Sequence, residues 1–252
     1  MTQTRIWTAA IIVIGDEILS GRTQDRNIAQ IAAWLNVQGI RLKEARVVGD
    51  TEQAIADAVN LMRAAHDYVF TTGGIGPTHD DITVDAIAAA LCVPVIIHPG
   101  ARDLLERYYA DRGGLNEGRL RMARVPEGAD LIANPVSGAP GIKVGNIFIM
   151  AGIPHITAGM LEGLTGTLEG GRPLVSVTVG AYAPESEVAE LLRVVEKSEE
   201  GIAVGSYPFF KEGRVGSNFV IRSEDQALAD KAAKQLADEL NAAGFPSTIG
   251  GL

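Results

Sequence analysis

One stretch of the chain combines glycines, hydroxyl groups and two adjacent carboxylates: TTGGIGPTHDD, residues 71–81. The apolar run DYVF begins just before it and the run ITVDAIAAAL follows it, which indicates a strand leading into the turn and a helix leaving it. Such a turn leaves backbone N–H groups unpaired at the positive end of the helix dipole, where a phosphate can accept them. The pattern predicts either a phosphate site or a plain tight turn, and it does not decide between them.

Candidate ligand-binding residues lie in this turn and just after it. Gly73, Gly74 and Gly76 permit close approach of the backbone to a ligand, and Thr78 and Thr83 carry hydroxyl groups. Neither common phosphate fingerprint fits, because the turn lacks the Lys-Ser/Thr ending of a Walker loop and the G-x-G-x-x-G spacing of a dinucleotide site.

The carboxylates of Asp80 and Asp81 sharpen the choice. A carboxylate beside a phosphate repels it unless a divalent cation or a basic group lies between them. Asp16 raises the same question at the end of the first strand-like run, where open α/β sheets bind their ligands. We therefore expect a divalent metal ion of the Mg, Mn or Co class, with Asp16, Asp80 and Asp81 as candidate ligands. The alternative for either Asp80 or Asp81 is that it caps the following helix.

Asp50 follows another strand-like run, RLKEARVVGD. If the first three strands are parallel neighbours, Asp50 meets the other carboxylates at one edge of the sheet. The alternative is an N-cap role, because Gln53 stands three residues later as in a capping box.

A further glycine and proline cluster, NPVSGAPGI, spans residues 134–142. It could wrap a ligand through the Ser137 hydroxyl and the backbone at Gly138 and Gly141, or it could merely turn the chain. By itself the cluster is a weak signal.

Apolar strand-like runs alternate with helical periodicities through the first two thirds of the chain, which is typical of a mainly parallel sheet covered on both faces. Gly145-Asn146 predicts a two-residue hairpin, and Pro154 suits the first turn of a helix. We expect one three-layer α/β domain over residues 1–168.

Residues 167–174, TLEGGRPL, are the best linker candidate because two glycines and a proline lie between periodic segments. The order β-α-β-β-α then predicts a small α+β domain over residues 173–252. Ser223 and Gln226 form a possible capping box for its last helix, which we expect to stop near Gly244 and Pro246.

Composition excludes several classes of protein. The chain has 252 residues, of which 46% are hydrophobic and 21% charged, with a net charge of −9. This balance gives no broad electrostatic footprint for nucleic acid or an anionic membrane, and no apolar run approaches the roughly 20 residues of a membrane span. The single cysteine, Cys92, excludes an intrachain disulfide, favours a cytoplasmic location and, among apolar neighbours, is expected to fill the core.

Five motifs in order carry a resemblance to a known family: IGDEILSGRTQDRN, VVGDTEQAI, TTGGIGPTHDDIT, MARVPEGADLIANPVSGAPGI and SYPFF. Together they resemble the amino-terminal domain of the competence/damage-inducible protein A (CinA) family, within the molybdopterin-binding, MoaB/Mog-like superfamily. The resemblance covers essentially the whole chain. It implies the three-layer domain and the small α+β domain, key carboxylates at Asp50 and Asp81, and a homo-oligomer.

The resemblance also implies a reaction. The CinA amino-terminal domain is similar to a metal-dependent pyrophosphatase acting on ADP-ribose-like nucleotides, and a similar domain accompanies FAD synthetases. Related proteins bind or adenylylate molybdopterin, so molybdopterin is a possible ligand. The expected ligand is a nucleotide or pterin phosphate. The leading hypothesis is a divalent-metal-dependent pyrophosphatase for ADP-ribose-like nucleotides, with Asp50 and Asp81 as the candidate catalytic residues.

Two departures from the family pattern leave alternatives open. Full-length CinA continues into a deamidase domain, whereas this chain stops at Leu252, so we do not expect deamidation. Where the superfamily has a Pro-Gly-x-Pro-x-Glu segment, the chain reads AGIPHI, with Ala151 and Ile156 at the outer positions. The alternatives are a molybdopterin- or nucleotide-binding protein without turnover and, less favoured, a molybdopterin adenylyltransferase.

Overall fold

The computed structural model describes residues 5–211 and 213–252. The chain divides into two compact units between Gly171 and Arg172, inside the segment that the sequence indicates as a linker. None of the helices in the described ranges is long and apolar enough to cross a membrane. Each unit is considered separately below.

A mixed sheet of six strands forms the centre of the first unit, in the order β2-β1-β3-β8-β7-β6. Its strands are β1 (Trp7–Ile14), β2 (Ile40–Val48), β3 (Tyr68–Thr72), β6 (Asp130–Ile132), β7 (Gly141–Val144) and β8 (Ile147–Met150). Strands β2, β1, β3 and β8 pair in parallel, whereas β7 is antiparallel to both of its neighbours. The expected mainly parallel α/β sheet is therefore confirmed.

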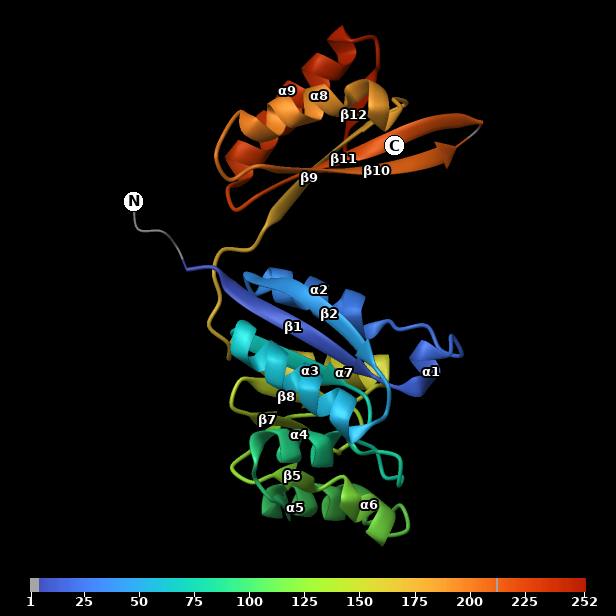
Figure 1. Ribbon diagram of the computed structural model, residues 1–252, viewed down its shortest axis with the longest axis vertical. Coiled ribbons are helices and arrows are strands. Elements are labelled where there is room, and N and C mark those ends of the chain that lie inside the picture. Colours follow the sequence, from blue (N-terminus) through green and yellow to red (C-terminus); the bar gives the residue numbers. More distant parts are fainter. Residues whose placement is uncertain (1–4, 212) are drawn as a thin grey trace. The chain divides into compact units, whose positions relative to one another are not determined.

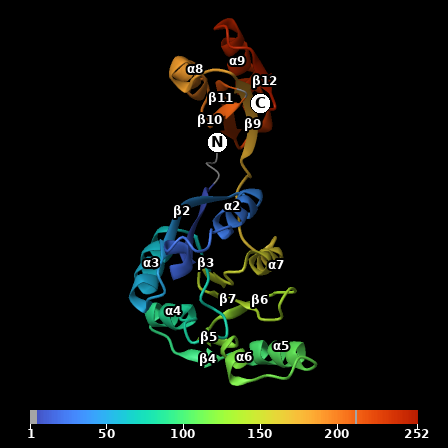
Figure 2. The ribbon, with the colours of Figure 1, turned by 90° about the vertical axis from the view of Figure 1, so that its right-hand side faces the viewer.

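Helices cover both faces of this sheet (Figures 1 and 2). On one face pack α3 (Glu52–Ala65) and α4 (Thr83–Leu91), and on the other α2 (Asn27–Val37) and α7 (Pro154–Leu164). Alternate residues of β1 serve the two layers: Ala10, Ile12 and Ile14 face the first helix pair, and Ala9, Ile11 and Val13 face the second. Near-continuous apolar strands form because both faces of a parallel sheet are buried.

The remaining elements of this unit are short. They are α1 (Asp16–Leu19), β4 (Val95–Ile97), α5 (Pro99–Tyr109), α6 (Glu117–Arg121) and β5 (Arg124–Pro126). β4 and β5 pair with each other in a separate two-stranded sheet. Beside that sheet, Ala101 and Leu105 of α5 pack with Ala123 in a small cluster of their own.

The second unit is a four-stranded antiparallel sheet with two helices. It comprises β9 (Val175–Ala181), α8 (Glu185–Lys197), β10 (Ala203–Lys211), β11 (Arg214–Ser223), α9 (Gln226–Ala242) and β12 (Ser247–Ile249), with the strand order β10-β11-β9-β12. The predicted β-α-β-β-α order is present. The last helix stops as expected, but a further strand, β12, follows it and pairs with β9.

Three local expectations need correction. Asp50 does not cap α3, because Thr51 is the N-cap and accepts from the N–H of Ala54. Ser223 does not cap α9, because Asp225 takes that role. Cys92 is exposed rather than buried, and it ends α4 in the left-handed conformation with φ +57°. The two-residue turn predicted at Gly145-Asn146 joins β7 to β8, with a positive φ at Gly145.

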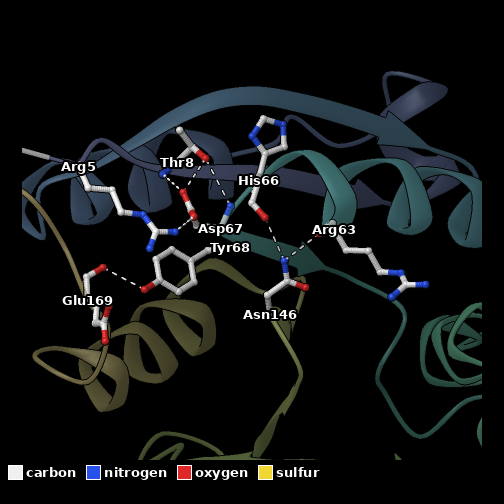
Figure 3. A network of polar contacts seen from close by, with 8 residues as sticks. All are labelled: Arg5, Thr8, Arg63, His66, Asp67, Tyr68, Asn146 and Glu169. Atoms are coloured by element: carbon white, nitrogen blue, oxygen red, sulfur yellow. Dashed lines mark hydrogen bonds and ion pairs between the residues drawn. The ribbon is translucent and has the colours of Figure 1, made fainter.

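The amino ends of β1 and β3 are joined by a polar network (Figure 3). The carboxylate of Asp67 accepts hydrogen bonds from the backbone N–H of Thr8 at 2.8 Å, from its hydroxyl at 2.9 Å and from the Arg5 guanidinium at 2.5 Å. The Asn146 side chain donates to the carbonyl groups of Arg63 and His66 at the end of α3. These contacts tie the helix, the hairpin and two strands together at the edge of the sheet opposite the glycine turn.

Candidate functional site

The glycine turn lies at the carboxyl edge of the parallel strands. The register aligns Ile14 with Val48, Val13 with Thr72, and Thr72 with Met150. The segments that follow β1, β2, β3 and β8 therefore meet at one edge, as the parallel order of the strands requires. This is where the sequence predicted that the carboxylates and glycines would converge.

A pocket with a volume of about 630 Å³ opens at this edge. That volume is in the range of small-molecule sites, roughly 300–1,000 Å³. Of the residues predicted from the sequence, Gly73, Gly74, Gly76, Asp81 and Ser137 line it. Thr78, Thr83, Gly138, Gly141, Asp16, Asp50 and Asp80 are not among its lining residues.

The first two glycines of the turn are fixed by close packing. A Cβ added to Gly73 would stand 2.2 Å from the Ile14 carbonyl oxygen, and one added to Gly74 would stand 2.2 Å from Thr83 Oγ1. Both glycines have positive φ, +105° and +65°. The Thr83 hydroxyl donates to the Gly73 carbonyl at 2.9 Å, and Thr83 is fully buried. This buried hydrogen bond helps to hold the turn in its conformation.

Backbone donors remain free in the middle of the turn. The N–H of Gly73 donates to the Met150 carbonyl, and the N–H of Thr83 donates to the Gly74 carbonyl. The donors at both ends of the turn therefore already have acceptors. The N–H groups of Gly74, Ile75 and Gly76 have no acceptor in the part of the chain that the structure describes, and all three residues line the pocket. Consecutive free N–H groups of this kind form a concave binding place for an anion.

Asp81 stands beside these donors. One of its oxygens accepts from the N–H of Thr78 at 2.8 Å and from its hydroxyl at 2.5 Å, which holds the carboxylate within the turn. A Cβ on Gly76 would stand 2.6 Å from the same carboxylate. The nearby Thr78 side chain and the Asp80 backbone N–H also lower the pKa of the exposed Asp80 carboxyl.

Asp16 and Asp50 form a reciprocal pair. Asp50 Oδ2 accepts from the N–H of Asp16 at 2.8 Å, and Asp16 Oδ1 accepts from the N–H of Asp50 at 3.2 Å. These two hydrogen bonds join the residues that follow β1 to those that follow β2. The second oxygen of each carboxylate has no hydrogen bond within the described ranges, so both remain able to take a ligand.

No cluster of three or more His, Cys, Asp or Glu side chains arranged to hold a metal ion occurs among the described residues. The structure thus places Asp81 in the pocket and Asp16 beside Asp50 instead of gathering the three predicted ligands at one point. This donor set fits Mg²⁺, which is commonly held by one or two carboxylates together with water and the phosphates of its substrate. It does not fit an ion that needs a complete protein cage.

The loop 134–142 divides between two cavities. Ser137 lines the main pocket and accepts a hydrogen bond from the Asn134 side chain at 2.7 Å. Gly138 lies against the Tyr108 ring and lines a different cavity. Gly141 is buried at the start of β7 against Met160 and Ile132, so it packs in the core and does not contact the pocket.

Several pocket residues carried no individual prediction. Arg26 is exposed on the rim and brings a positive charge, and the buried Asn27 donates to the Gly152 carbonyl at 2.8 Å. Both belong to the motif SGRTQDRN, which signalled a family resemblance but no chemical role. Ala151 and Ile156, the two departures from the family pattern, also line the pocket.

Two further polar atoms near the turn are buried without a hydrogen-bond partner in the described part of the chain. Thr72 Oγ1 belongs to a residue that lines the pocket and is 1% exposed. Arg121 Nε belongs to a residue that lines a notch of about 10 Å³ beside Gly76 and Asp81, with room for about one water molecule. Unpaired buried polar groups are costly, and a ligand that paired with them would remove that cost.

Comparison with family models gives two matches. Residues 10–170 match the family described as the probable molybdopterin binding domain. Residues 173–248 match the middle domain of FAD synthase. The boundary between the matched ranges falls where the two structural units divide.

Similar proteins of several organisms support the first match. A protein of Aeropyrum pernix is 35% identical over 88% of this chain and 79% of its own length. A CinA-like protein of Desulfosudis oleivorans is 35% identical over 81% of this chain, which spans only 52% of that protein. The crystal structure of the protein CinA, of unknown function, from Thermoplasma acidophilum has a TM-score of 0.59 and 32% identity over 63% of this chain and 96% of that one. This chain therefore belongs to the family of the probable molybdopterin binding domain and is CinA-like.

Proposed function

We propose that the pocket binds the diphosphate of an ADP-ribose-like nucleotide and that the chain hydrolyses it with a divalent metal ion. The observation that carries this proposal is the row of free N–H groups at Gly74, Ile75 and Gly76, beside the Asp81 carboxylate. Amides bind a phosphate without adding charge, and the Arg26 guanidinium supplies a further donor at the same pocket.

Each group has a distinct role in this proposal. The amides of the turn hold one phosphate, and Arg26 at the rim offsets part of the negative charge. Asp81 would hold the metal together with phosphate oxygens, and the metal would lower the charge repulsion and polarise the phosphorus–oxygen bonds. Asp50, with one oxygen not used by Asp16, is our candidate proton acceptor.

The reaction balances as a simple hydrolysis. A water oxygen bonds to one phosphorus of ADP-ribose, and the bond from that phosphorus to the bridging oxygen breaks. The products are AMP and ribose 5-phosphate, and the water proton passes to the base. The match of residues 173–248 to a domain of FAD synthase supports the substrate class, because FAD is also a dinucleotide joined by a diphosphate.

Incubation with ADP-ribose and Mg²⁺, Mn²⁺ or Co²⁺ tests this proposal. We expect AMP and ribose 5-phosphate in equal amounts, with no product in EDTA. Absence of AMP with all three ions, or undiminished activity in Asp81→Ala, would refute hydrolysis.

A second function is binding of a nucleotide or molybdopterin without turnover. It is favoured by Ala151 and Ile156, apolar residues in the pocket where the resemblance implies a proline and a glutamate. Titration calorimetry with ADP-ribose and with molybdopterin separates the two functions. Binding without product across both ligands supports the second, whereas turnover excludes it.

A further inference from the structure

The sheet of the second unit has one covered and one open face. Helices α8 and α9 both lie on the same side of β9, β10 and β11 (Figure 1). The core residues of this unit, among them Val179, Phe219 and Ile221, all project to that side. Because side chains alternate along a strand, the intervening residues form a second face that no helix of this unit covers.

The open face, as we call it, consists of residues 176, 178 and 180 of β9, alternate residues 203–211 of β10 and alternate residues 214–222 of β11. These strand positions include Lys211, Arg214 and Arg222 and no aspartate or glutamate. The whole chain has a net charge of −9, so this face is positive on an acidic protein. Net charge alone predicted no broad footprint for nucleic acid, but it does not describe how charge is distributed over a single face.

Two aromatic rings of this face pack against glycines. A Cβ on Gly205 would be 3.2 Å from the Tyr207 ring, and a Cβ on Gly216 would be 2.5 Å from the Phe209 ring. Each ring therefore packs at a position where a larger residue in place of the glycine would collide with it. Tyr207 is 47% exposed and Phe209 is half-buried.

Cations are attached to these rings and to a third. The Arg222 guanidinium donates to the Tyr207 hydroxyl, and Arg214 stands 3.8 Å from the centre of the Tyr182 ring, which packs edge-on against Phe209. Gly251 and Leu252 lie over Gly180 and Asn218, so the β9 end of the face is occupied by the chain itself. The chain end thus reaches β11 at Asn218, whereas Tyr207, Lys211 and Arg214 of the same face are exposed.

We propose that the β10–β11 half of the open face binds single-stranded nucleic acid. Tyr207 and Phe209 are two residues apart on one strand, about 6.6 Å, which allows one base to stack on each ring. Lys211, Arg214 and Arg222 are the cations of the same face, and we expect the phosphates of the bound nucleic acid to contact them. A second copy of this chain is a poor partner for this face, because its cations would meet identical cations. An acidic peptide is also a poor partner, because it offers no planar groups to stack on the two rings.

Fluorescence anisotropy of the whole chain with a labelled ten-nucleotide oligouridylate tests this proposal at 50 mM salt. We expect binding whose logarithmic salt dependence has a slope of about −2, from three cations at about 0.7 each. Tyr207→Ala and Phe209→Ala should each weaken binding at least about fivefold, and Arg214→Gln with Arg222→Gln should flatten the salt slope. The matched control is Phe210→Ala, an exposed residue of the same strand on the opposite face.

Other outcomes overturn the proposal. They are no binding by the wild-type chain, an equal loss in Phe210→Ala, equal affinity for a polyglutamate peptide, or loss of binding in Asp81→Ala, which would place the oligonucleotide in the pocket of the first unit. Thermal unfolding of each variant identifies those that lose their fold. Because Arg214 and Arg222 lie on the surface, their glutamine variants test the proposal even if a ring variant unfolds.

Discussion

The two edges of the parallel sheet use carboxylates in opposite ways. At the amino edge, Asp67 accepts three hydrogen bonds from Thr8 and Arg5 (Figure 3), and its side chain is only 20% exposed. At the carboxyl edge, the hydrogen bonds that Asp81 accepts within the described residues come from Thr78 alone, and the neighbouring backbone N–H groups have no acceptor there. A carboxylate saturated by its own chain holds the fold, whereas one beside unused donors is available to a ligand. The following variants test that distinction, from the largest expected effect to the smallest.

Asp81→Ala should lower the rate of AMP formation from ADP-ribose about 100-fold or more, because it removes the charge that would hold the metal beside the diphosphate. The midpoint of thermal unfolding should change little. The mirror variant is Asp67→Asn, which should lower the midpoint and leave the rate per folded molecule unchanged. If both variants lose stability and activity together, the two edges do not differ as proposed.

Gly74→Ala should lower the free energy of unfolding by about 3 kcal/mol or more, since a left-handed residue and a clash with Thr83 combine there. Gly21→Ala is the control for conformation alone, because Gly21 has a φ of +71° and no atom within 4 Å of the added Cβ. Its expected cost is about 1 kcal/mol. Urea unfolding measures both, and equal losses would show that packing against Thr83 is unimportant.

Asp67→Asn should cost about 2 kcal/mol at pH 7, because it removes a charged acceptor from the donors of Thr8 and Arg5. Burial acts to raise the pKa of Asp67, but the hydrogen bonds from Thr8 and Arg5 outweigh it and hold this pKa below its ordinary value. The stabilisation is therefore present above the unfolded pKa of about 4 and is lost as pH falls through the lower folded pKa. Unfolding free energies of the wild type and the variant should converge in acid; a constant difference down to pH 2 would contradict this.

Asp16→Ala and Asp50→Ala should each cost about 1 kcal/mol, because each removes one acceptor of the reciprocal pair. The two variants should differ in function, since Asp50 is the proposed base. We expect Asp50→Ala to reduce AMP formation far more than Asp16→Ala, with rates and unfolding curves measured on the same preparations. Equal rates in the two variants would assign Asp50 to structure alone.

Much of the fold followed from patterns that need no tertiary information. Apolar runs of strand length alternating with helical periods predicted the parallel layers, and Gly145 and Pro154 marked a hairpin and a helix start correctly. The capping role left open as an alternative for Asp50, and the one expected of Ser223, belong to the neighbouring residues Thr51 and Asp225, which offer the same chemistry. Several adjacent polar residues can cap a helix, and only the path of the chain selects one.

The sequence by itself determined where the glycine turn and its carboxylates would lie, because residues 71–81 follow a buried strand. Only the tertiary structure decided which groups share that site. It placed Asp81 in the pocket, paired Asp16 with Asp50, and moved Gly138 and Gly141 into packing contacts. It also brought Arg26 to the rim of the pocket and packed the rings of Tyr207 and Phe209 against glycines in the second unit. Spacing along a chain indicates which residues reach the same edge of a sheet, whereas a contact depends on the direction of each side chain and on competition for hydrogen bonds.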